Sequence, residues 1–204
     1  MAAKRLAVLV VLSVVLGASG WAQVNEVSLT VGRSFVSTQT VPSTNLPIHF
    51  GNEESFAFNY GRLLLTRGIL GVSAELPVAI YPRMDLNYNQ GLVPKDIGAV
   101  FVTPSVRANL FSGQGVSPWV SVGGGYAHFR EAPTLTFNAV NPGSTGTNTG
   151  VLQFGAGLDV WPWEHWGARL EARDFYSGIP DYDVVTGKSR QHNYYVGIGV
   201  IYRF

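Results

Sequence analysis

Apolar and polar residues alternate along most of this chain with a period of two, which is the period of a β-strand. The clearest case is the last stretch of the sequence, where one phase is apolar or aromatic and the other is mostly small or polar. The apolar phase holds Tyr194, Val196, Ile198, Val200, Tyr202 and Phe204, and the other holds Asn193, Tyr195, Gly197, Gly199, Ile201 and Arg203. Successive strand residues point to opposite faces, so this segment is expected to present one apolar surface.

Eight segments carry this pattern, and long polar connections alternate with short turns between them. The segments cover residues 27–33, 55–65, 70–80, 100–111, 118–129, 151–160, 168–176 and 193–204. The long connections are Ser34–Glu54, Tyr81–Gly98, Arg130–Thr149 and Ser177–Gln191, and the short turns are Thr66–Gly68, Ser112–Ser117 and Trp161–Trp166. This arrangement predicts an all-β fold, an eight-stranded antiparallel up-and-down transmembrane β-barrel. A soluble sandwich or a lipocalin would show similar spacing.

Proline and glycine modify the predicted strands. Pro77 and Pro104 lie inside segments that a closed barrel would pair fully, and proline cannot donate to the ladder. We expect a bulge or an unpaired carbonyl at each proline. Gly61 is expected to mark a further bulge in the second segment.

The polar phase carries charges of both signs, which distinguishes it from a lipocalin interior. The charged residues of this phase are Glu75, Arg107, Asp159, Arg169, Glu171, Arg173 and Arg203. An eight-stranded barrel has an interior just wide enough for its own side chains. We therefore expect these charges to pair in a salt-bridged network that plugs the lumen, with inward glycines leaving space for the arginines. Arg169 and Arg203 could instead lie at the mouth in water.

Aromatic residues gather near the ends of the predicted strands. Trp119, Trp161, Trp163 and Trp166 are expected to form an aromatic girdle at the short-turn end, together with Tyr202 and Phe204. A second group near the long-loop end comprises Tyr81, Tyr126, Phe129, Phe175 and Tyr194. Aromatic girdles at both interfaces are typical of transmembrane barrels. The tryptophan-rich turn could alternatively bind a partner.

Composition supports a membrane barrel and excludes several other classes. Charged residues are 13% and aromatic residues 12% of the 204 residues, and the formal net charge is +1. The arginines are scattered, so no nucleic-acid partner is expected. Cysteine is absent, which excludes disulfides, thiolate metal sites and a cysteine nucleophile.

The beginning of the chain has the features of an export signal. Lys4 and Arg5 precede an apolar core over Leu6–Leu16, and Gly20 and Ala22 have the spacing of a cleavage site. The core is shorter than the roughly 20 residues that a spanning helix needs. We predict a cleavable signal peptide over residues 1–22 and a barrel domain over residues 23–204.

The terminal strand resembles the C-terminal strand of bacterial outer-membrane barrels, in which a glycine, an aromatic or apolar residue and a final Phe are read by the barrel assembly machinery. Gly199, Tyr202 and Phe204 match this signal. Segments 103–107, 118–126 and 169–176 are similar to strands of the OmpA/OmpX-like family of small barrels. The resemblance implies a location in the outer membrane and contact with outer-membrane lipid and lipopolysaccharide.

The sequence predicts no catalytic, cofactor-binding or metal-binding residue. His128 lacks the serine two residues later that the resemblance to lipid A deacylases would require, and Asp174, Asp181 and Asp183 lack the spacing of a calcium loop. We expect a monomeric, non-enzymatic barrel with a structural role or with loops that bind an unknown extracellular ligand. The alternatives are a small, porin-like channel and a lipid-modifying enzyme.

Overall fold

The structure, a computed structural model, describes residues 24–89, 93–112 and 114–204. The predicted signal peptide, residues 1–22, lies outside the described residues. Among the residues that are described, no helix is long and apolar enough to cross a membrane.

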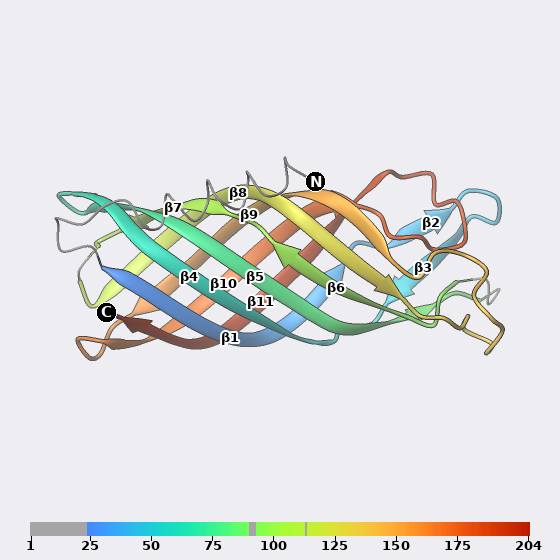
Figure 1. Cartoon of the computed structure of the whole chain (residues 1–204), viewed down its shortest axis with the longest axis horizontal. Coiled ribbons are helices and arrows are strands. Elements are labelled where there is room, and N and C mark those ends of the chain that lie inside the picture. Colours follow the sequence, from blue (N-terminus) through green and yellow to red (C-terminus); the bar gives the residue numbers. More distant parts are fainter. Residues whose placement is uncertain (1–23, 90–92, 113) are drawn as a thin grey trace, which may run out of the picture.

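In the part of the chain that the structure describes, eleven strands form one antiparallel sheet that closes on itself (Figure 1). They are β1 (Asn25–Val36), β2 (Gln39–Val41), β3 (Leu46–Phe50), β4 (Glu54–Arg67), β5 (Leu70–Asn87), β6 (Asp96–Val102), β7 (Ser105–Leu110), β8 (Val116–Glu131), β9 (Thr147–Val160), β10 (Trp166–Gly178) and β11 (Arg190–Arg203). The ring runs β1–β4–β5–β6/β7–β8–β9–β10–β11, and β11 pairs with β1. Because β6 and β7 occupy one position, the ring formed by the described residues has eight strands, which confirms the predicted barrel.

Neither proline produces the expected bulge or unpaired carbonyl, and this prediction is wrong. The strand splits into β6 and β7 at Thr103–Pro104, but its register opposite β8 is the same on both sides and the Pro104 carbonyl accepts the N–H of Gly124 at 3.2 Å. Pro77 also stays in register, opposite Asn59, and its carbonyl accepts the N–H of Thr103 at 3.1 Å. The expected bulge at Gly61 is wrong, since the register shifts two residues later, between Leu63 and Leu65.

The barrel continues past the apolar band at its long-loop end. The predicted loop 81–98 is largely strand, because β5 extends to Asn87 and β6 begins at Asp96. The first loop folds into the β2–β3 hairpin, which pairs with the end of β5 through His49 and Asn87. Inward Ile48, Met84 and Ile97 are buried and give this extension an apolar core.

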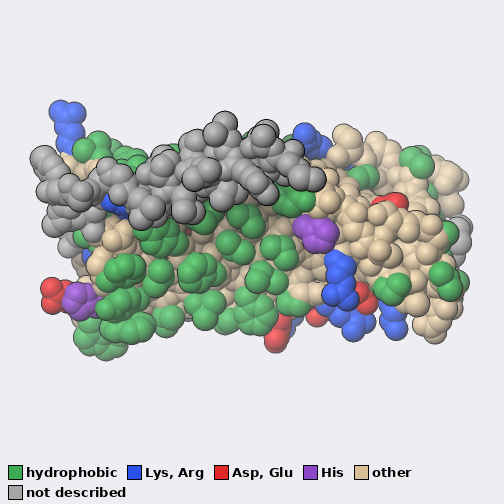
Figure 2. All heavy atoms as spheres, viewed as in Figure 1, with side chains coloured by type: hydrophobic (Ala, Val, Ile, Leu, Met, Phe, Trp, Pro, Cys, Tyr) green, Lys and Arg blue, Asp and Glu red, His purple; other side chains and the backbone are tan. Residues whose placement is uncertain are grey.

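An apolar band covers much of the outer wall (Figure 2). Its exposed members alternate along the strands with buried lumen residues, as the sequence predicts, and include Leu29, Val31, Phe56, Phe58, Val120, Val122, Leu152, Phe154, Leu170, Ile198 and Val200. Toward the long-loop end the surface becomes polar and charged (Figure 2). Exposing such a continuous apolar band to water would cost free energy, whereas the band matches the hydrocarbon core of a bilayer.

Candidate functional site

The half of the lumen nearest the short turns contains a layer of buried charged side chains. Arg169 on β10 donates two hydrogen bonds to Asp159 on β9, from Nε and Nη2, each at 2.7 Å. The same Nη2 lies 3.0 Å from Glu26 Oε1 on β1, and Nη1 donates to the Ser28 hydroxyl at 3.0 Å. Arg107 on β7 donates to the same oxygen of Glu26. Four strands are therefore joined through one set of ion pairs.

A second set of ion pairs lies next to the first. Arg173 donates to Glu75 through Nη2 and to Glu171 through Nε, the latter at 2.8 Å. Glu171 also accepts the hydroxyl of Thr30 at 2.6 Å, which links β10 to β1. All three charged side chains have no exposed surface. Each arginine has an acidic partner, as a buried charge requires.

The structure thus brings together six of the seven charges predicted in the lumen: Glu75, Arg107, Asp159, Arg169, Glu171 and Arg173. Arg203 is apart from them, half-buried at the mouth, with its guanidinium carbon 3.8 Å from the centroid of the Trp161 ring. Glu26 was not predicted, because it precedes the residue at which the first alternating segment was recognised. Its position two residues before inward Ser28 is the signal that identifies it.

Trp119 is not part of an aromatic girdle, and that prediction is wrong. Its side chain lies inside the lumen with 3% of its surface exposed, and Nε1 donates to Asp159 at 3.1 Å. The guanidinium carbons of Arg107, Arg169 and Arg173 lie 5.6, 5.3 and 5.1 Å from its ring centroid. Trp119 shares the strand phase of inward Ser121, so alternation places it inside.

The other predicted girdle tryptophans lie at the short-turn end. Trp163 and Trp166 are exposed, at 69% and 52%, whereas Trp161 is half-buried beneath Arg203. Trp166 packs against Tyr202 with ring centroids 4.8 Å apart, and Tyr202 stacks on Phe204 at 6.0 Å. Two of the three assembly-signal residues, Tyr202 and Phe204, are therefore part of the exposed aromatic rim. The third, Gly199, packs against the backbone of Leu29 and Thr30 on β1.

The half of the lumen nearest the long loops is filled by aromatic rings instead of charged side chains. Tyr81, Phe101, Phe129, Phe175 and Tyr195 are all buried, and neighbouring ring centroids are 4.7–6.4 Å apart. Tyr81, Phe129 and Phe175 were predicted on the outer rim, and this is wrong. Each follows an inward residue by two positions and shares its phase. Of the predicted outer group, Tyr126 and Tyr194 are exposed.

Glycine makes room for the largest of these inward side chains. A Cβ atom on Gly157 would lie 2.4 Å from the Trp119 ring, and one on Gly197 would lie 2.2 Å from the Tyr195 hydroxyl. No side chain fits at either position without displacing its neighbour. The small residues of the polar phase are therefore required by the packing of the lumen.

The long loops pack against one another above the aromatic layer. Phe50 of β3 contacts Tyr182 of the fourth loop with ring centroids 5.8 Å apart, and Thr44 shares a 2.9 Å hydrogen bond with Tyr88 of the second loop. The backbone N–H of Asp181 donates to Glu131 at the end of β8 at 3.1 Å. Phe137, Val140 and Val185 project from this cap with 73–82% of their surface exposed.

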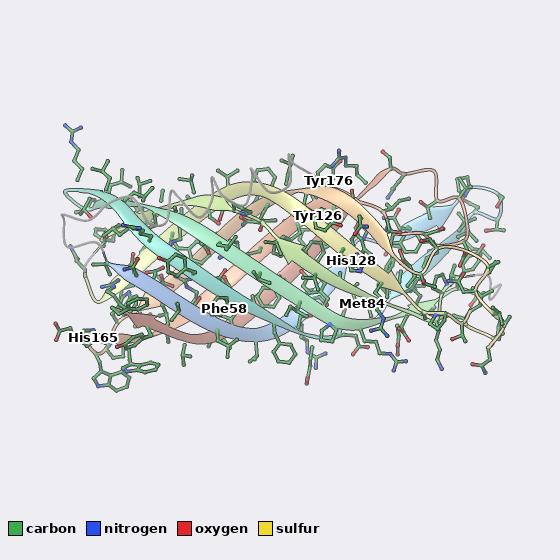
Figure 3. All side chains as sticks on the ribbon, viewed as in Figure 1. Phe58, Met84, Tyr126, His128, His165 and Tyr176 are labelled. Atoms are coloured by element: carbon green, nitrogen blue, oxygen red, sulfur yellow. The ribbon has the colours of Figure 1, made fainter. Side chains whose placement is uncertain are left out.

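The histidines lie on the outer wall and in exposed segments. His128 Nδ1 lies 2.7 Å from Asn148 Oδ1, and His192 Nδ1 lies 2.7 Å from Asp174 Oδ2. Tyr126, His128 and Tyr176 lie toward the long-loop end, whereas His165 is at the opposite end (Figure 3). Among the described residues, no group of three or more His, Asp or Glu side chains is arranged to hold a metal ion.

No protein-family model matches this sequence, and no curated protein matches it. Solved structures do match. Ail, the attachment invasion locus protein of Yersinia pestis, solved with the heparin analogue sucrose octasulfate, is 14% identical with a TM-score of 0.51, covering 90% of this chain and 100% of Ail.

Two further barrels match over similar lengths. OprG from Pseudomonas aeruginosa is 13% identical with a TM-score of 0.55, over 89% of this chain and 95% of OprG. AlkL, solved in lipid bilayers, is 16% identical with a TM-score of 0.55, over 92% of this chain and 93% of AlkL. The closed ring of eight strands, its apolar outer band and these matches lead to one conclusion: the chain has the fold of the small transmembrane β-barrels of the bacterial outer membrane.

Proposed function

We propose that this protein is a monomeric, closed outer-membrane barrel that does not conduct ions and acts through its extracellular end. The observation that carries this proposal is the filling of the lumen at two successive levels. The ion pairs around Arg169 and Arg173 occupy the periplasmic half, and the rings around Phe101 occupy the extracellular half. A hydrated ion would have to break buried ion pairs and then cross an apolar layer, and both steps are costly.

The extracellular end is suited to binding because its loops support one another. The contact of Phe50 with Tyr182 and the hydrogen bond of Thr44 with Tyr88 join different loops. A preorganised surface loses less conformational entropy when it binds a partner than separate mobile loops would. The ligand of Ail is a property of Ail, and for this chain a sulfated glycan is one candidate to be tested.

Conductance distinguishes this proposal from the rival channel. We expect the purified barrel to give no steady current in planar lipid bilayers. A variant that opens both layers, Phe101→Ala with Phe175→Ala and Arg169→Ala, is the positive control, provided that it still folds. A steady ohmic current from the wild-type protein would refute the closed barrel.

Binding and lipid chemistry are tested on intact cells. Replacing Phe137, Val140 and Val185 by serine should leave the folded protein at its usual level and weaken binding of the cells to immobilised partners that these apolar tips contact. The rival enzyme would place its chemistry near the Asp174–His192 pair on the outer wall. A mass shift of lipid A that depends on His192 would favour the enzyme and contradict the proposal.

A further inference from the structure

A partly open cavity of about 160 Å³ lies at the periplasmic end of the lumen, beneath the charged layer. Its lining comes from seven barrel strands and the adjoining segments. The polar residues that bear on its chemistry are Glu26, Ser73, Arg107, Asn109, Asp159 and Arg203. The closed-barrel proposal assigns no role to this cavity, whose wall includes charged side chains of the buried ion-pair layer.

Hydrogen-bond donors without partners gather on this lining. Arg107 is 2% exposed, and its Nε and Nη1 atoms have no hydrogen-bond partner on the protein. The Nε atom of Arg203 also has none. The three atoms are all guanidinium N–H donors, and among the described residues of the lining no fully buried acceptor lacks a partner.

The carboxylates beside the cavity already accept hydrogen bonds from other lumen residues, through both oxygens of Asp159 and one oxygen of Glu26. Asp159 accepts hydrogen bonds from Arg169 through both oxygens and from Trp119. Glu26 Oε1 accepts from both Arg107 and Arg169. The acids therefore do not satisfy the remaining donors of Arg107, whose Nη1 lies 3.9 Å from Asp159, beyond hydrogen-bonding distance.

Charge at this end is also unbalanced. Among these five side chains, Arg107, Arg169 and Arg203 supply three positive charges and Glu26 and Asp159 supply two negative charges, which leaves one excess positive charge. The next level of the lumen has the opposite balance, with Arg173 against Glu75 and Glu171. A single negative charge in the cavity would lie closer to the level with the excess positive charge than to the level with the excess negative charge, and would therefore be attracted.

We propose that this cavity binds one small oxyanion, a carboxylate or phosphate group, that enters from the periplasm. Guanidinium groups present N–H donors in a fixed fork that matches such oxygens. The volume of about 160 Å³ is many times the roughly 10–15 Å³ that one water needs, so the cavity has room for a group the size of acetate or phosphate. The oxyanion could be a free ion or the terminal carboxylate of a peptide.

Two tryptophans make binding observable. Trp161 lies 3.8 Å beneath the Arg203 guanidinium and Trp119 lies 5.6 Å from that of Arg107. We would titrate the refolded barrel in detergent micelles with sodium acetate and inorganic phosphate, replacing sodium chloride at constant ionic strength. A saturable fluorescence change is expected, and neutral acetamide should produce none. N-acetylalanine and its amide distinguish a peptide carboxylate from a free ion.

Variants at the same end of the barrel test the assignment. Arg203→Gln should weaken binding about tenfold or more, since a hydrogen bond to a charged group is lost. Arg67→Gln, which removes an exposed arginine that does not line the cavity, should leave the titration unchanged. If Arg107→Gln fails to fold, the Nε–H resonances of the wild-type arginines provide a second measurement. They should show two arginines shifting with acetate.

The outcomes are decisive in both directions. Saturation by acetate or phosphate that depends on Arg203 supports the site, whether or not N-acetylalanine also binds. A response that is linear, that acetamide reproduces, or that Arg67→Gln weakens equally would mean water and general screening only, and would overturn the proposal. None of these results bears on conductance, so the failure of this inference is distinguishable from failure of the closed-barrel proposal.

Discussion

Replacing Arg173 should lower the free energy of unfolding of the barrel clearly, because its one guanidinium neutralises two buried carboxylates. Its partners Glu75 and Glu171 have no exposed side-chain surface. Replacing Arg173 by methionine preserves much of the volume but leaves both acids without their direct cation. Breaking a buried ion pair costs about 3–5 kcal/mol, and two carboxylates are stranded here, so we expect the upper part of that range.

A compensated variant separates charge from packing. Glu75→Gln and Glu171→Gln added to Arg173→Met remove all three charges while keeping similar shapes. Because no uncompensated charge remains, this triple variant should recover most of the lost stability. If instead packing alone were responsible, the triple variant would be at least as unstable as the single one.

Urea unfolding in lipid vesicles measures these free energies. Trp119, whose ring centroid is 5.1 Å from the Arg173 guanidinium carbon, supplies a fluorescence signal within the network. Arg67→Met is the matched control, since it makes the same change at an exposed position and should alter stability by only about 0.5 kcal/mol or less. Equal costs for Arg173→Met and Arg67→Met would refute the reasoning that the network is buried and structural.

Three further predictions concern assembly, orientation and pH. Phe204→Asp should leave the protein exported but unfolded in the periplasm, as shown by loss of a heat-modifiable band from outer-membrane fractions. Protease added to intact cells should cleave loop 132–146 but not turn 161–165, and the reverse pattern would invert the topology. Burial, with two neighbouring carboxylates, raises the pKa of Asp183 in the fourth loop, so its charged form strains the loop and loop stability falls as pH rises through that pKa. Asp183→Asn should therefore slow proteolysis of the loop at neutral pH, and an unchanged rate would count against this interpretation.

The sequence by itself determined the number of strands in the barrel ring and, through strand phase, which charged residues of the recognised segments face inward. Successive Cβ atoms point to opposite faces of a strand, so alternation separates the residues into two faces. The continuous apolar face must be the one that contacts lipid, and the other face therefore lines the lumen. The same rule would have placed Trp119, Tyr81, Phe129 and Phe175 inside. Those predictions failed where the known preference of aromatic residues for interfaces was given more weight than strand phase.

The tertiary structure alone decided which inward residues meet. Contacts across the lumen depend on the register and stagger of all eight strands, and no local pattern encodes them. Arg169 meets both Asp159, ten residues away, and Glu26, 143 residues away, at the same nitrogen. The division of the lumen into a charged half and an aromatic half follows from this stagger. So do the unpartnered donors of Arg107 and Arg203 at the short-turn end.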